Sequence, residues 1–282
     1  MKKLTRVLLT IASIVFVLGL VLVISGFISG GSIKNVRLIG GKVYDYVDFD
    51  KDYSKETIEN LELEVSTGKL HIEEGEAFRV VGTDVVENSI EVGVKNNTLY
   101  IKENDNSSWG WIHHIGITLF SKESKITVYV PKDFVAKNTE LDVEAGGLVI
   151  KKLTTDILDL DVEAGKATVD KLTVNDKASI DVEAGSVSGD GYNGKNLEID
   201  VSAGSCNLSG AFYEKLDMDC SAGSINIDTS LGADEYSYDL DQSAGSVRVN
   251  GESYKHYDGK NSTAANSIVA KTSAGTIKIE TK

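Results

Sequence analysis

Residues 180–185 read IDVEAG, and this frame belongs to a set of seven in the C-terminal half of the chain. The other copies are LDVEAG (141–146), LDVEAG (160–165), IDVSAG (199–204), MDCSAG (218–223), LDQSAG (240–245) and KTSAG (271–275). Successive alanines are separated by 19, 20, 19, 19, 22 and 30 residues. A period near 20 indicates a repeat architecture of stacked units.

Each frame lies within an alternating pattern of apolar and polar residues. In the copy at 160–165, Leu160 and Val162 precede the alanine, Ala167 and Val169 follow it, and polar residues fill the positions between. Alternation with period two is typical of strands that bury one face. Each repeat therefore predicts two short strands joined at Ala-Gly. We expect the glycine to supply a positive φ at this corner, and the alanine to stack inside it.

A repeat of this length cannot bury its own apolar face, but stacked neighbours form one core. The sequence therefore predicts an all-β protein, a parallel β-solenoid like a single-stranded β-helix, with coils of about 19–20 residues. An antiparallel meander closed as a sandwich is the alternative. It explains less well why identical residues recur at the same position of each repeat. Regular repeats are expected over 138–282, an irregular β part of the same domain over 61–137, and a linker with an N-terminal cap over 30–60.

The N-terminus has a different composition. Lys2, Lys3 and Arg6 precede an uncharged, mostly apolar run over 7–28, which is long enough to cross a hydrocarbon core of about 30 Å. We expect a transmembrane helix over 7–29, with residues 1–6 cytoplasmic and the C-terminal domain extracytoplasmic. Small residues at the end of the run leave a cleaved signal peptide as the alternative.

Charge and cysteine usage restrict the possible partners. The chain carries a net charge of −14, and the first 31 residues hold three cations and no acids, so the remainder carries −17. This excludes nucleic acid as an expected partner, because phosphate binding requires clustered Lys and Arg. Cys206 and Cys220 fall in inward phases, where free cysteine acts as a small buried apolar residue. A disulfide between them is possible but not required.

Carboxylates recur on the outward face three residues before six of the seven alanines. Asp161, Asp181, Asp200 and Asp219 are the candidate metal ligands of this column. A solvated face is the alternative, since two charges about 4.8 Å apart in water repel by only about 0.9 kcal/mol. We favour that alternative and expect neither metal nor cofactor.

Catalysis has little support in the sequence. The Asp columns lack neighbouring Arg, Lys or His, and Arg248 and Lys278 lie isolated on the second strand of their repeats. No catalytic residue is therefore assigned, and we do not expect an enzyme. Two alternatives stay open: a β-helix enzyme that acts on a cell-surface polysaccharide through stacked Asp columns, and a cation-binding accessory protein of the envelope-stress response.

The segment 104–120 interrupts the repeats and contains both tryptophans, Trp109 and Trp111. As a loop tip it could contact a partner, and as a cap it would cover an end of the solenoid. Trp109 and Trp111 are the candidate partner-binding residues.

Together with the N-terminal run and the repeated frames, the motifs TGKLHIEEG (67–75) and VYVPKD (128–133) carry a resemblance to a known family. Over about residues 60–282 the chain resembles the bacterial putative-adhesin family, β-strand-repeat domains of unknown function related to the head-GIN type, in its membrane-anchored form. The resemblance implies a single-stranded β-helix without catalytic residues. It also implies an adhesin-like or envelope-associated binding or scaffold role, with an unidentified envelope or surface protein or a glycan as partner.

Overall fold

The structure is a computed structural model that describes residues 36–39, 42–103, 123–261 and 263–282. These residues form two units. In the smaller unit, β1 (Val36–Ile39) pairs antiparallel with the start of β2 (Lys42–Asp52). The larger unit holds the other strands. Described residues contain no helix long and apolar enough to cross a bilayer, and the helix predicted over 7–29 lies outside them.

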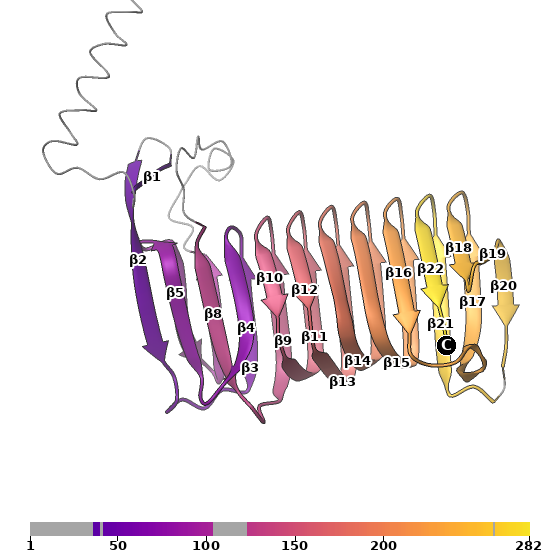
Figure 1. Cartoon of the computed structure of the whole chain (residues 1–282), viewed down its shortest axis with the longest axis horizontal. Helices are drawn as coiled ribbons and strands as arrows, with labels where there is room; N and C mark the ends of the chain where they lie inside the picture. The colour runs from indigo at the N-terminus through magenta and orange to yellow at the C-terminus, as the bar shows by residue number, and fades with distance from the viewer. Residues whose placement is uncertain (1–35, 40–41, 104–122, 262) are drawn as a thin grey trace, which may run out of the picture. The chain divides into compact units, whose positions relative to one another are not determined.

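Two series of parallel strands build the larger unit (Figure 1). In each coil, the strand that ends at the Ala-Gly corner, or its counterpart in an irregular coil, belongs to the A series. The strand that follows the corner belongs to the B series. The A series consists of β3 (Asn60–Val65), β7 (Thr98–Glu103), β9 (Ala136–Val143), β11 (Leu153–Val162), β13 (Leu172–Val182), β17 (Tyr236–Gln242), β21 (Asn266–Thr272) and the second parts of β14 (Ser186–Val201) and β15 (Ser205–Cys220). The B series consists of β4 (Lys69–Gly75), β8 (Lys125–Pro131), β10 (Gly147–Ile150), β12 (Lys166–Val169), β16 (Ser224–Thr229), β18 (Ser246–Val249), β22 (Thr276–Glu280) and the first parts of β14 and β15.

The register of the repeats agrees with the predicted solenoid-like stacking. Strand β11 pairs parallel with β13 so that Leu160 lies opposite Ile180, and β13 pairs with β14 so that Ile180 lies opposite Ile199. These residues are buried in one continuous apolar core. Parallel pairing of equivalent residues rules out the antiparallel meander.

The Ala-Gly corners differ from the expectation in two respects. None of the described glycines in the seven frames has a positive φ; Gly68, at the equivalent corner between β3 and β4 in the motif at 67–75, does, with +85°. Glycine is required for another reason: a Cβ at Gly185 would lie 2.5 Å from the carbonyl oxygen of Gly165 on the preceding coil. The alanines do not stack inside the corner either, because Ala184 and its equivalents are exposed.

Backbone hydrogen bonds continue through the corners. The amide of Ala164 donates to the carbonyl of Glu144 at 2.7 Å, and the amide of Lys166 donates to Gly146 at 3.0 Å. Close backbone approach therefore replaces side-chain packing at this edge, which explains why the frame needs small residues.

The coils at both ends do not follow chain order. The last coil, β21 and β22, lies between the coil of β15–β16 and the coil of β17–β18. The first coil, β3 and β4, likewise lies between β7–β8 and β9–β10.

Antiparallel strands cover the outermost coils. Strands β5 (Arg79–Val86) and β6 (Ile90–Lys95) pair with β8 and β7. At the other end, β19 (Glu252–Tyr254) and β20 (His256–Gly259) pair with β18 and β17. The short 3-10 turn Ala233–Glu235 precedes β17. The longer steps between the last frames thus accommodate this cap.

Both cysteines are free and buried, as predicted for core positions. Cys206 lies between Val187 and Ile225 in its column. Burial raises the pKa of the Cys206 thiol to about 12 and also raises the pKa of the Cys220 thiol. Both thiols are therefore protonated at neutral pH and poor nucleophiles.

Candidate binding faces

The outward face of the A series carries the predicted Asp column. Asp161, Asp181, Asp200 and Asp219 lie opposite one another in successive strands. Asp142 extends the column on β9. Among the described residues, no group of three or more His, Cys, Asp or Glu is arranged to hold a metal ion.

The carboxyl groups of the column lie close enough together to shift one another's pKa values. Burial, and then the carboxylates of Asp200 and Asp161, raise the pKa of Asp181 above its ordinary value. Burial and the carboxylate of Asp219 do the same for the pKa of Asp200. Desolvation and repulsion both disfavour the ionised form, so the column destabilises the folded state at neutral pH.

We expect Asp181→Asn to raise the free energy of unfolding at neutral pH by about 0.5 kcal/mol, in the range for like charges that face each other across strands. The folded state holds the Asp181 proton more tightly than the unfolded chain does, so wild-type stability falls as pH rises through the folded pKa. The gain should therefore vanish only well below about pH 3.9, the ordinary pKa of aspartic acid, where the wild-type carboxyl is protonated in both states. Urea unfolding at several pH values measures this.

Asp241→Asn provides the matched control, because Asp241 lies at the end of the column and opposite Lys271. Its removal should leave stability unchanged or lower it slightly. A gain for Asp181→Asn that stays constant with pH would contradict the account of the column.

Lys271 corrects the expectation that the Asp columns lack cations. Because β21 is inserted between β15 and β17, Lys271 lies opposite both Asp219 and Asp241. The sequence places Lys271 more than 25 residues from either one, so only the coil order reveals this arrangement. Arg248 and Lys278 were also expected to be isolated, but they lie opposite each other on β18 and β22.

A second outward carboxylate position in the A series is partly neutralised by lysines. Lys177 pairs with Glu198 at 3.3 Å, and Lys215 pairs with Asp217 at 2.6 Å. These side chains are about half exposed, and such surface pairs each contribute little stability. They nevertheless reduce the negative charge of this face.

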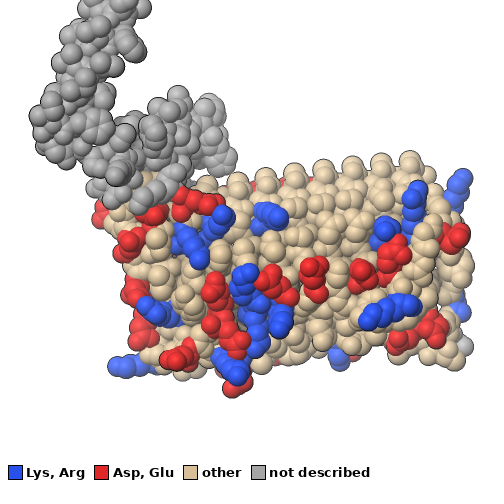
Figure 2. All heavy atoms as spheres, viewed as in Figure 1, with Lys and Arg blue, Asp and Glu red and all other residues tan. Residues whose placement is uncertain are grey.

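The outward face of the B series has a different chemistry. Its middle coils carry six uncharged polar residues in two columns, which we call the hydroxyl–amide strip. The strip consists of Ser186, Ser205 and Ser224 in one column and Ser188, Asn207 and Asn226 in the other. Figure 2 shows a band across this face without Lys, Arg, Asp or Glu, with charged side chains toward both ends and in a row beside it.

The strip keeps most of its hydrogen-bonding capacity. The Asn226 amide donates to the Asn207 side-chain oxygen at 2.6 Å. Within the described part of the chain, none of the four serine hydroxyls of the strip has a hydrogen-bond partner. Sequence reasoning missed these residues, although they recur two and four positions after successive alanines.

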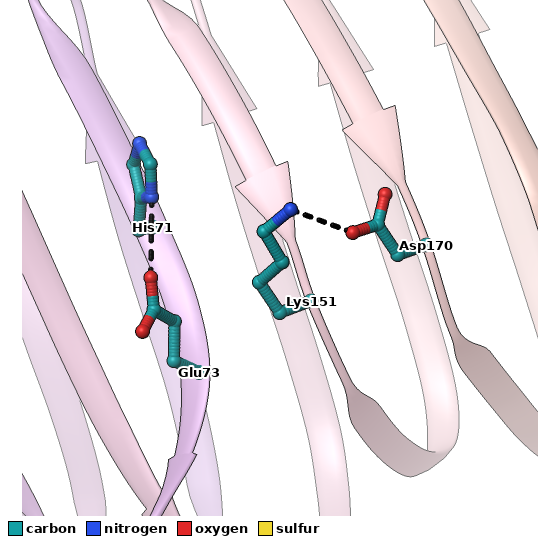
Figure 3. Close-up of polar contacts among 4 residues, drawn as sticks. All are labelled: His71, Glu73, Lys151 and Asp170. Atoms are coloured by element: carbon teal, nitrogen blue, oxygen red, sulfur yellow. Dashed lines mark hydrogen bonds and ion pairs between the residues drawn. The ribbon is translucent and has the colours of Figure 1, made fainter.

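A mixed-charge cluster lies beside the strip on β4, β10 and β12 (Figure 3). His71 Nδ1 lies 3.3 Å from Glu73 Oε1, and Lys151 Nζ lies 2.7 Å from Asp170 Oδ2. Figure 3 shows Lys151 turned toward Asp170 and away from the His71–Glu73 pair. Burial, and then the charge of Lys125, lower the pKa of His71, so its ring is neutral at pH 7. The Lys151–Asp170 pair thus links two neighbouring coils, whereas His71 and Glu73 lie on the same strand, β4.

The predicted candidates Trp109 and Trp111 lie outside the described residues. The candidate binding faces among the described residues are therefore the Asp column of the A series and the hydroxyl–amide strip of the B series.

Comparison with known proteins gives one family match. A family model described as Toastrack DUF4097 matches residues 58–251. No curated protein matches the chain.

Several solved structures are similar over most of the chain. A protein described as a putative lipid binding protein from Parabacteroides distasonis is 13% identical, with a TM-score of 0.49, covering 84% of this chain and 96% of its own. A putative adhesin from Bacteroides fragilis is 15% identical, with a TM-score of 0.39 and coverage of 83% and 97%. A putative cell adhesion protein from Clostridium sporogenes is 17% identical, with a TM-score of 0.36 and coverage of 84% and 100%.

Proposed function

This chain belongs to the Toastrack DUF4097 family, and from that premise we propose that it is an adhesin-like, envelope-associated binding and scaffold protein without catalytic activity. The observation that carries the proposal is the in-register repetition of outward side chains over successive coils. Such columns present the same chemical group at intervals of about 4.8 Å. A surface of this kind suits an extended, repetitive ligand that makes many weak contacts.

The stack itself supports a scaffold role. Parallel pairing and close corner contacts fix each coil against its neighbours, and the large apolar side chains point into one core. The outward residues can therefore change without loss of the fold, while their spacing stays fixed. This is the property that a binding scaffold requires.

We also propose that residues 7–29 anchor the chain in the cell membrane with the strands outside the cytoplasm. The support is the uncharged run itself and the cations that precede it. A membrane-impermeant thiol reagent applied to intact cells tests the location. The variant Ser202→Cys, exposed at a corner, should be labelled, whereas the wild-type chain should not, because its cysteines are buried. Labelling of Ser202→Cys only after lysis would contradict the location.

Binding is tested by comparing the full chain with a variant that lacks residues 32–282. Cells that produce the full chain should retain envelope material or adhere to surfaces more strongly than cells that produce the deletion variant. Equal retention would contradict the binding role. Chemical conversion of a retained glycan by the full chain would contradict the non-catalytic part.

A further inference from the structure

We propose that the hydroxyl–amide strip binds a neutral polysaccharide that runs across the B-series strands. This inference rests on the proposed binding function and specifies its ligand. Serine hydroxyls and asparagine amides each donate and accept hydrogen bonds, which is the capacity that sugar hydroxyls require. The strip presents these groups in two straight columns over β14, β15 and β16.

The alternation of the strands fixes the direction of these groups. Val187, Cys206 and Ile225 lie between the two columns in the chain and are buried. Their neighbours must therefore point outward. Because the serine hydroxyls have no partner in the described part of the chain, a ligand can bond to them without breaking internal hydrogen bonds. The binding groups are thus held in place before the ligand arrives.

A groove extends the strip at the Ala-Gly corners. It is shallow, has a volume of about 380 Å³ and runs over three coils past Ala164, Lys166 and Ala184 to Ser186. The small residues of this groove offer apolar contact to the carbon-bound hydrogens of a sugar ring, next to the serine column. The alanine methyl groups and the serine column together form a surface for a ligand that has both apolar and polar groups.

Charge decides between a neutral and an anionic polymer. No charged side chain lies within the strip. Asp190 and Asp228 follow its second column by two residues, and Lys166 and Lys278 lie opposite Ser186 and Asn226 at its two ends. These flanking charges have both signs, so the balance is set by the chain beyond residue 31, which carries −17. This net charge opposes the approach of an anionic polymer, whereas an uncharged polymer is not repelled.

Binding of polysaccharides to the full chain tests the inference. We would immobilise the detergent-solubilised full chain and apply neutral polymers (dextran, mannan, xylan and cello-oligosaccharides) and anionic ones (alginate and polyphosphate). The variant Ser186→Ala/Ser205→Ala/Ser224→Ala removes one column of hydroxyls from exposed or half-buried positions and should fold normally. Asp161→Asn/Asp200→Asn/Asp219→Asn on the A series is the matched control.

We expect at least one neutral polymer to bind, with affinity reduced about tenfold or more in the serine variant and changed less than about twofold in the control. Equal binding by the serine variant, with cooperative unfolding intact, would overturn the assignment of the strip. Binding of anionic polymers alone would overturn the charge argument. If cells with the full chain adhere but no neutral polymer binds, the ligand class is wrong and the binding role survives. If neither occurs, both proposals fail.

Discussion

Replacing Gly185 with alanine should lower the free energy of unfolding by about 3 kcal/mol, at the upper end of overpacking costs in well-packed cores. The new Cβ would lie 2.5 Å from the Gly165 carbonyl oxygen and 2.7 Å from Val162 Cγ1. The oxygen is backbone that accepts the hydrogen bond from the Ser186 amide at 3.0 Å. It therefore cannot move aside without separating two coils, and urea unfolding followed by far-UV circular dichroism measures the loss.

Ala184→Ser provides the matched control one residue away. Ala184 is exposed, so its substitution should change stability by less than about 0.5 kcal/mol. If Gly185→Ala unfolds at the same urea concentration as the wild type, close backbone contact is not what requires glycine at the corners.

Removal of residues 265–282 should destroy more structure than the removed coil itself. Among the described residues, β17 pairs with β21 and the cap strand β20, and β18 pairs with β22 and the cap strand β19. Without the last coil, both lose their parallel partner, and the removed Ile268, Ile277 and Ile279 are fully buried. Each such side chain contributes about 1.5–3 kcal/mol of gross burial. Hydrogen exchange should then show loss of protection from about residue 230 onward.

The remaining coils give the internal control for that experiment. Strands β11 and β13 lie far from the removed coil in the stacking order and should keep their protection. Protection of β17 and β18 at wild-type levels after truncation would contradict the inserted position of the last coil.

The core and the Asp column could be predicted from the sequence, because each consists of residues at a fixed position in every repeat. Leu160, Ile180 and Ile199 recur at one phase, and parallel stacking brings equal phases together. The family match confirms the resemblance that was based on the repeated frames and the motifs at 67–75 and 128–133. The role of glycine was predicted wrongly, since a corner glycine suggests positive φ whereas the actual constraint comes from another coil.

Coil order could not be predicted, because the last three frames place similar β-branched residues at the inward positions after the Ala-Gly corner. Val247 and Ile277 are equivalent in phase, and nothing local distinguishes the coil that stacks on β16. Only the longer steps of 22 and 30 residues hint at inserted strands. The position of Lys271 beside the Asp column depends on this order.

The hydroxyl–amide strip was within reach of the sequence but carried no conventional motif. Ser186, Ser205 and Ser224 recur at a fixed phase, yet serine on an outward strand face ordinarily indicates only solvent exposure. The absence of charge across three coils becomes meaningful only when the strands lie side by side. The binding role of the strip could therefore be inferred only from the register of the strands in the structure.

The most direct test of this account is a pair of engineered disulfides that distinguishes an inserted last coil from coils stacked in chain order. Thr276 lies opposite Ser224 on one side and Ser246 on the other. The variant Ser224→Cys/Thr276→Cys should form a disulfide under mild oxidation. The variant Ser224→Cys/Ser246→Cys should not, because a whole strand separates the two positions by about 9.6 Å. The opposite result, a bridge between positions 224 and 246 and none between 224 and 276, would show stacking in chain order and contradict the account.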